Sequence, residues 1–347
     1  MNKLIVCDYP SAYTFPSVGS ESMGSSEKRL WEVARTATTL PGLQVILTGP
    51  LWLPEHVPGA EYFPQRLDET TLDEFLQIYG QADYLFAGHE YFDKENYQFT
   101  FSKVARHSIS YQLHPYDYEG KVVFDGRHTH LFCYSDEMME RYSKQSPRKL
   151  LLYHTGVDEV PFLTEEPDPY LLWMGRIDGE KAPHLAILAA REIGLPIHIL
   201  GKTVYDQEYS KIYHEVLNLP HVVHHSVLYG RKKMSLISRA SCGIYTLAES
   251  YSEAGAAVLG EMLTSGIPIA GISWRGNDAI CEAVASPKVG RIARISSEDS
   301  EKNIVLALAT AIEECRNLSR KEIFEDSKVR FDMRRLVSEM LTIVEMQ

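Results

Sequence analysis

Short apolar runs alternate with amphipathic segments along most of the chain. Runs of four to seven residues of this kind are typical of buried strands, and their alternation with helical patterns predicts parallel sheets with crossover helices. The first series comprises residues 3–9, 43–49, 83–88, 108–114, 130–135 and 149–154, and the second comprises residues 170–175, 197–201, 221–227, 243–247 and 267–271. The pattern predicts an α/β protein.

The alternation stops once, at a proline-rich, acidic segment. Residues 155 to 169 separate the two series and are therefore the predicted linker between two Rossmann-like domains. We expect domains at residues 1–155 and 156–327, followed by a C-terminal helix at 328–347. Ligands of such sheets bind at the carboxyl ends of the strands, so the segments that follow each strand are the first candidates for a site.

Composition sets further limits on the protein class. The chain has 347 residues, of which 44% are hydrophobic, enough for two cores. Its formal net charge of −12 argues against a nucleic-acid partner, because such binding draws on many Lys and Arg contacts to phosphate. The five cysteines are widely spaced and lie mostly in apolar runs, which indicates reduced core residues.

We expect a cytoplasmic protein. The N-terminal apolar run is too short for a signal peptide, and no later run approaches the length of a membrane span. Four cations between Arg141 and Lys149 leave peripheral membrane association open. A solvated helix end is the alternative interpretation of that cluster.

Residues 250 to 271 carry the first candidate site. A polar segment after a predicted strand leads into a predicted helix at 256–264, with Glu253 at its entrance and Glu261 further in. Gly255 and Ala256 carry little bulk there, so a phosphate could approach the free amides of the first turn, Ala257 included. An amphipathic helix with two solvated glutamates is the alternative.

Residues 175 to 181 carry the second candidate. Gly175 ends a predicted strand, and Arg176 and Lys181 flank a turn that opens a predicted helix at 182–191. Both cations could converge on one diphosphate. The alternative is that they pair locally with Asp178 and Glu180.

Two candidates lie in the first half. His114 ends a predicted strand, a position that favours a functional histidine over a core or surface one. The long Ser/Gly-rich segment after the first strand contains Gly24 and leads to a helix predicted to begin at Ser25 or Ser26. That helix start could face an anion or a sugar, although a plain helix cap explains it nearly as well.

The Glu-x7-Glu pattern, followed by E-M-x-x-S-G-x-P, resembles the signature of the retaining family-4 glycosyltransferases of GT-B fold. Residues 175–181 resemble the G-R-L-x-x-x-K motif of that family, with Ile177 in place of leucine. The resemblance implies that Arg176 and Lys181 contact the donor diphosphate. It also implies that Glu253 binds the donor sugar and that Glu261 binds the ribose.

Weaker resemblances extend through the chain. Gly24 matches the first glycine-rich loop of the family, His114 matches a histidine beside the donor sugar, and residues 153–162 match an interdomain segment with Thr155 in place of asparagine. Where the family has E-G-F-G-L, this chain has E-A-G-A-A. The family fold implies two domains facing across a cleft, with the C-terminal helix crossing back to the first.

The implied activity is hexosyl transfer with retention, from a nucleotide diphosphate sugar such as UDP-glucose to a saccharide or lipid-linked saccharide acceptor, in envelope or extracellular polysaccharide synthesis. His114, Arg176, Lys181 and Glu253 would be its catalytic residues. No D-x-D sequence occupies a suitable loop, so we expect neither a metal nor another cofactor. Two alternatives remain: a nucleotide-sugar 2-epimerase on the same scaffold, and a non-catalytic nucleotide-sugar-binding subunit.

Overall fold

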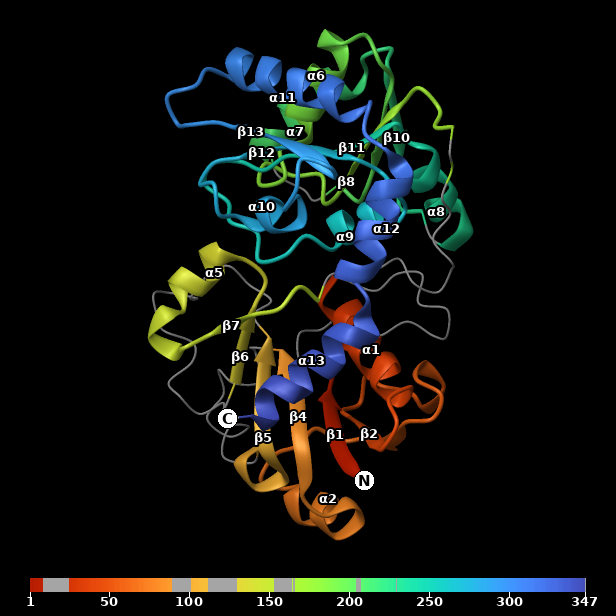
Figure 1. Ribbon diagram of the computed structural model, residues 1–347, viewed down its shortest axis with the longest axis vertical. Helices are drawn as coiled ribbons and strands as arrows, with labels where there is room; N and C mark the ends of the chain where they lie inside the picture. The colour runs from red at the N-terminus through yellow and green to blue at the C-terminus, as the bar shows by residue number, and fades with distance from the viewer. Residues whose placement is uncertain are drawn as a thin grey trace. The chain divides into compact units, whose positions relative to one another are not determined.

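The computed structural model divides into two compact units (Figure 1). Unit 1 comprises Met1–Leu152 and Asp332–Gln347, and unit 2 comprises Tyr153–Phe331. Each unit contains its own parallel sheet and its own core. The residues that the structure describes are 1–8, 25–88, 101–111, 130–152, 164, 166–203, 207–228 and 230–346.

Unit 1 is built on a parallel sheet in the order β3-β2-β1-β4-β5-β6-β7. The central strands are buried apolar runs, because helices and loops cover both faces of such a sheet. The order reverses between β1 and β4, as in a doubly wound sheet. The strands are β1 (Asn2–Cys7), β2 (Leu43–Thr48), β3 (Glu61–Phe63), β4 (Ala82–Gly88), β5 (Ala105–Tyr111), β6 (His130–Cys133) and β7 (Arg148–Lys149).

The last helix of the chain belongs to unit 1, although it follows unit 2 in sequence. Its apolar face packs on α1, with Leu336, Val337 and Met340 buried, and the Glu345 carboxylate accepts a hydrogen bond from the Tyr84 hydroxyl. The described helices of this unit are α1 (Ser25–Thr38), α2 (Leu72–Tyr79), α5 (Asp136–Arg141) and α13 (Met333–Glu345), with short 3-10 turns at Pro54–His56 and Ser143–Gln145.

Unit 2 repeats the same topology. Its parallel sheet has the order β10-β9-β8-β11-β12-β13, so the strand order reverses between β8 and β11. All six strands run parallel to their neighbours. They are β8 (Leu171–Met174), β9 (Ile197–Leu200), β10 (Val222–His225), β11 (Cys242–Tyr245), β12 (Ile269–Ser273) and β13 (Gly290–Arg294).

Helices cover both faces of the second sheet (Figure 1). On one face α6, α7 and α11 pack together over a core of Leu, Ile and Ala side chains, and on the other face α9, α10 and α12 are in contact. These helices are α6 (Pro183–Glu192), α7 (Gln207–Leu217), α8 (Gly230–Arg239), α9 (Ala257–Leu263), α10 (Ala279–Ala283), α11 (Glu301–Cys315) and α12 (Arg320–Arg330).

One predicted strand is shorter than its apolar run. Only Arg148–Lys149 pairs in β7, whereas the run 149–154 was expected to form the strand. The reason is the buried Tyr111 hydroxyl, which donates to the Leu150 carbonyl at 2.6 Å and accepts from the Leu152 amide at 3.2 Å. The Leu150 amide still donates to the Cys133 carbonyl of β6 at 2.9 Å, and beyond that bond the contacts with Tyr111 take the place of the strand ladder.

Two other features bear on the class of protein. The five cysteines form no disulfide, and four of them are buried, Cys281 being the exception. Within the described ranges, no helix has the length and apolar character needed to cross a membrane.

Candidate functional site

The site lies at the switch point of the unit 2 sheet. β8 and β11 are neighbours there, and the segments that leave them lead into helices on opposite faces, α6 and α9. The two segments diverge at the carboxyl ends of the strands, which is where ligands of such sheets bind. Both candidate motifs of the second half, residues 175–181 and 250–261, follow these two strands. The fold therefore brings together motifs that are about 70 residues apart in sequence.

The segment after β8 forms a turn held by its own side chains. The Asp178 carboxylate accepts the Lys181 amide at 2.9 Å, which fixes the turn before α6. Arg176 lies 2.9 Å from the Asp178 carboxylate and also pairs with Glu180, so the local pairing considered from the sequence does occur for this residue. Its side chain is still 48% exposed, and a ligand can therefore reach the guanidinium.

Lys181 points to the other motif. Its ammonium forms an ion pair with the Glu253 carboxylate. The Lys181 side chain is 14% exposed and the Glu253 side chain is 15% exposed. The ammonium also lies over the Tyr251 ring, 4.7 Å from its centroid. The first glutamate of the Glu-x7-Glu pattern is thus in direct contact with the lysine of the G-R-I-x-x-x-K segment.

Hydrogen bonds from the backbone and from side chains hold the two segments together. The Ala248 amide donates to the Glu180 carbonyl at 2.8 Å, and the Thr246 hydroxyl donates to the Lys181 carbonyl at 2.8 Å. The buried Trp173 indole donates in turn to the Thr246 hydroxyl at 2.9 Å. Lys181 is therefore placed by a chain of bonds that begins inside the strand core.

Burial lowers the pKa of Lys181 to about 7, and the nearby Arg176 cation adds to this shift. Asp178 and Glu180 oppose it. The direct contact with the Glu253 carboxylate also favours the charged form, so the ammonium depends on the acidic groups around it. An anionic ligand at this position would have the same stabilising effect.

The second glutamate occupies a different environment. Glu261 lies within α9 and is only 3% exposed, so it is not a solvated side chain of an amphipathic helix. Its carboxylate lies 2.7 Å from the Lys233 ammonium, which comes from α8. Sequence reasoning did not find Lys233, although its position in the basic start of a helix after β10 was the available signal.

The segment after β12 supports the one after β11. The Trp274 indole donates to the Leu247 carbonyl at 2.8 Å, and Arg275 donates to the Glu249 carbonyl at 2.7 Å and to the Tyr251 carbonyl at 3.3 Å. Gly276 has a positive φ of 80°, and a Cβ there would lie 2.5 Å from the Arg294 guanidinium. The loops that follow β8, β11 and β12 are therefore joined to one another by hydrogen bonds at the carboxyl ends of these neighbouring strands.

The start of α9 differs slightly from the sequence prediction. The helix begins at Ala257, and Glu253, Gly255 and Ala256 precede it. Ala256 is the N-cap residue and has no polar side chain to accept a first-turn amide. The backbone amides at the start of α9 are therefore suited to binding an anion. The predicted contact of a phosphate with Gly255, Ala256 and Ala257 stays a prediction.

Other predicted site residues lie outside the described part of the chain. Gly24, His114 and the segment 153–162 belong to this group, so their proposed roles remain predictions. Ser25 begins α1, one of the two starts expected for that helix. The structure thus brings together Arg176, Lys181 and Glu253, with Glu261 further along the same segment.

No protein-family model and no curated protein sequence matches the chain. Solved structures do. AviGT4, a glycosyltransferase involved in avilamycin A biosynthesis, is 19% identical, with a TM-score of 0.64 over 97% of this chain and 98% of its own. HepE of Anabaena in complex with UDP is 12% identical, with a TM-score of 0.68 over 100% of both chains. Sucrose-phosphate synthase of Thermosynechococcus elongatus is 14% identical, with a TM-score of 0.66 over 100% of this chain and 99% of its own.

The chain has the GT-B fold. The sequence prediction of two Rossmann-like domains with parallel sheets is confirmed by these likenesses and by the two sheet orders. At such low identities the likeness establishes the fold alone. What the GT-B site of this chain does has to be argued from its own side chains.

Proposed function

We propose that this GT-B protein is a retaining glycosyltransferase that moves a hexose from a nucleotide diphosphate sugar to a hydroxyl acceptor. The observation that carries the proposal is the contact between Lys181 and Glu253 at the switch point of unit 2. It places a cation suited to a diphosphate directly beside a carboxylate suited to sugar hydroxyls. The sequence motifs that contain these two residues resemble the donor site of family 4.

In the proposed complex the donor diphosphate lies against Arg176 and Lys181. Both cations are within reach of solvent, and Lys181 exchanges the Glu253 carboxylate for a phosphate oxygen. Glu253 then accepts hydroxyl groups of the hexose. Glu261, held beside Lys233, receives the ribose hydroxyls of the nucleotide.

The proposed chemistry requires no protein nucleophile. The bond between the anomeric carbon and the leaving phosphate oxygen breaks, and the acceptor oxygen forms the new bond on the same face of the sugar. The departing phosphate takes the acceptor proton. Arg176 and Lys181 stabilise the negative charge that develops on the diphosphate, which is the main electrostatic task of the site.

The donor and acceptor classes rest on the resemblance and on the structural neighbours. HepE binds UDP and UDP-glucose, and we propose a UDP-sugar such as UDP-glucose as the donor here. We propose a saccharide or lipid-linked saccharide of an envelope or extracellular polysaccharide as the acceptor, bound by unit 1. The proposed transfer is independent of a metal ion.

The test is a thermal-shift panel of UDP-glucose, UDP-galactose, UDP-N-acetylglucosamine and GDP-mannose, followed by calorimetry for any donor that stabilises the protein. A ligand at one hundred times its dissociation constant adds about 2.7 kcal/mol of stability. Lys181→Met should remove about half of that stabilisation or more, because a tenfold weaker ligand at the same concentration adds only about 1.4 kcal/mol. Arg191→Met, an exposed cation in the last turn of α6, is the matched control and should behave as wild type.

Product analysis then distinguishes the candidate functions. The best donor is incubated with a mixed saccharide acceptor pool, and release of UDP is measured together with a new glycosidic product whose anomeric proton coupling reports retention. Interconversion of the donor sugar without transfer would identify an epimerase. Donor binding with no product would leave a nucleotide-sugar-binding subunit and refute the proposed transfer.

A further inference from the structure

The ion pair between Glu261 and Lys233 joins two helices that follow different strands. Lys233 lies in α8, which follows the edge strand β10, and Glu261 lies in α9, which follows β11. The Lys233 ammonium and a Glu261 carboxylate oxygen are 2.7 Å apart, and the Lys233 side chain is 25% exposed, whereas the glutamate is buried. The pair therefore lies at the edge of the core, where solvent reaches the lysine.

The surroundings of Glu261 make its charge depend on such a partner. The consecutive residues 259–263 of α9 are all buried, so a full turn of the helix is shielded from water, and α9 also contacts α10 and α12. A buried carboxylate is costly to keep ionised unless a cation or hydrogen-bond donors compensate its charge. In the free protein Lys233 provides a cation for this purpose.

The geometry of α8 explains why Lys233 makes this contact. The buried residues Met234 and Ile237 mark the inner face of the helix, and Lys233 lies on the same face, one turn before Ile237. Lys232 precedes it and is exposed. The basic start of α8 therefore directs one lysine toward α9 and the preceding one toward solvent.

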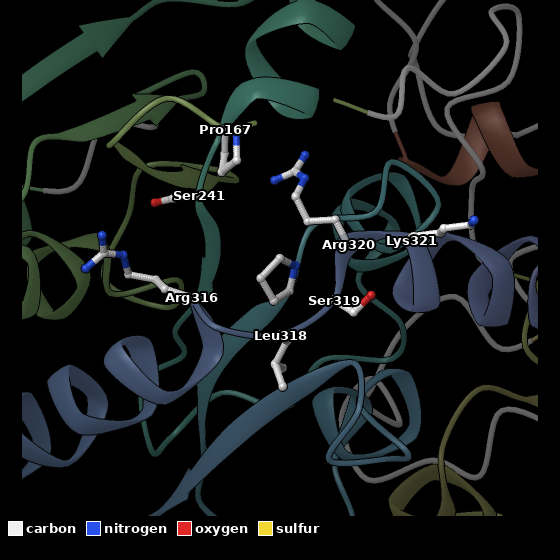
Figure 2. Close-up of a pocket in the computed structure, with 8 residues that line it drawn as sticks. Pro167, Ser241, Arg316, Leu318, Ser319, Arg320 and Lys321 are labelled. Carbon is white, nitrogen blue, oxygen red and sulfur yellow. The ribbon is translucent and has the colours of Figure 1, made fainter. Parts of the chain in front are cut away.

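The far end of α8 is held by side chains from two other segments. The Arg320 guanidinium, at the start of α12, donates to the Ser238 carbonyl and to the Ala240 carbonyl, the latter at 2.7 Å (Figure 2). The Tyr170 hydroxyl, just before β8, donates to the Leu236 carbonyl at 2.7 Å. These bonds fix α8 relative to the sheet, so the fold sets the position of its inward lysine.

We propose that Lys233 is a positioning residue, which holds the Glu261 carboxylate ionised and oriented for the ribose hydroxyls of the donor nucleotide. This role rests on the proposed function, in which Glu261 receives these hydroxyls. An ionised carboxylate accepts several hydrogen bonds at once, so contact with one ammonium is compatible with contact with two vicinal hydroxyls. Without the lysine, the buried carboxylate takes up a proton or turns toward another donor, and its geometry for the ribose is lost.

The experiment compares UDP with 2′,3′-dideoxy-UDP, which lacks both ribose hydroxyls, by calorimetric titration of the full chain. The measured quantity is the ratio of the two dissociation constants. Wild type should bind UDP about tenfold or more tightly than the dideoxy form, because hydrogen bonds to a charged group are lost with the hydroxyls. Lys233→Met should reduce this ratio to about two or less, mainly by weakening UDP binding. Lys232→Met removes the same charge from the same turn and should leave the ratio unchanged.

Two more variants separate positioning from a merely structural role, which would weaken both ligands together. Lys233→Arg keeps the cation and should keep most of the wild-type ratio. Lys233→Gln removes the charge but leaves a donor for the buried carboxylate, and its ratio should fall about threefold or more. Circular dichroism checks folding, and Lys233→Gln carries the test if Lys233→Met does not fold.

The outcomes distinguish this role from the proposed function. If wild type discriminates between the two ligands and Lys233→Met keeps the same ratio, the role of Lys233 is overturned and the proposed function stands. Equal binding of both ligands to wild type also overturns the role, because Glu261 would then not contact the ribose. Failure of wild type to bind UDP at all would refute the proposed UDP-sugar site itself, and the role of Lys233 with it.

Discussion

Because Lys181 and Glu253 are in contact, we expect substitutions of these two residues to change the affinity for UDP in opposite directions. In the proposed function Lys181 leaves Glu253 to bind the donor diphosphate, so the carboxylate competes with the ligand for the ammonium. Lys181→Met should weaken binding of UDP. Glu253→Gln should leave UDP affinity intact or raise it, because the competing charge is removed, while sugar transfer is lost.

The magnitude follows from the burial of the pair. Two unit charges about 4 Å apart at an effective dielectric of about 20 interact by about 4 kcal/mol, and the partial exposure of both side chains, 14% and 15%, reduces this figure. Since the ligand replaces one anion by another, we expect a net gain of about 1 kcal/mol for UDP in Glu253→Gln, or about fivefold. A charge-assisted bond contributes about 1.5 to 3 kcal/mol, so Lys181→Met should lose about tenfold or more.

These changes in the free energy of UDP binding can be measured in a double-mutant cycle. Wild type, both single variants and the double variant are titrated with UDP in a calorimeter. The double variant should match Lys181→Met, because Glu253 no longer has a cation to compete for. Thermal unfolding of each variant verifies that the comparison concerns folded protein. If Glu253→Gln lost UDP binding as severely as Lys181→Met, the carboxylate would contact the nucleotide and the proposed donor orientation would be wrong.

Four further results are expected. Arg176→Ala should reduce transfer about 10²-fold, and wild-type turnover in this variant would contradict its role at the leaving diphosphate. Chelator-treated protein should keep its transfer activity; activity that vanished and returned with magnesium or manganese would show that the proposed site lacks a component. Glu261→Ala should weaken UDP and UDP-sugar binding alike in calorimetry, since both carry the ribose, and a loss confined to the sugar nucleotide would reject that contact. UDP affinity should fall as pH rises from 7 to 9, because the ammonium that binds the diphosphate is lost above a pKa lowered to about 7, and Lys181→Met should show no such decline.

The central strands could be predicted from sequence because burial on both faces leaves them almost purely apolar. β4 and β12 are examples, with a single half-buried residue, Asp83, in the first and none in the second. The two strands that the pattern missed, Glu61–Phe63 and Gly290–Arg294, are both edge strands. An edge strand borders solvent on one side and tolerates charged residues, so its sequence lacks the apolar run.

The sequence predicted most of the charged side chains of the candidate site, but it did not predict which of them form ion pairs with one another. The sequence places Lys181 and Glu253 after different strands, and only the adjacency of β8 and β11 brings them into contact. Lys233 was missed because α8 follows β10, at the sheet edge, and a basic helix start there resembles any solvated one. Contact with the buried Glu261 depends on tertiary packing that no local pattern records.

These pairings give the free site a particular electrostatic state. Each glutamate of the Glu-x7-Glu pattern lies against a lysine, so neither carboxylate is buried as an uncompensated charge before a ligand arrives. In the proposed complex the diphosphate takes the place of Glu253 beside Lys181, and the Glu253 carboxylate is then free to accept hydroxyl groups of the hexose. Lys233 has no such competitor in the proposed complex, because it lies on α8 beside Glu261 rather than in the turn of residues 175–181 that receives the diphosphate. The proposed donor binding is therefore an exchange of partners at Lys181, while the ion pair between Glu261 and Lys233 stays in place.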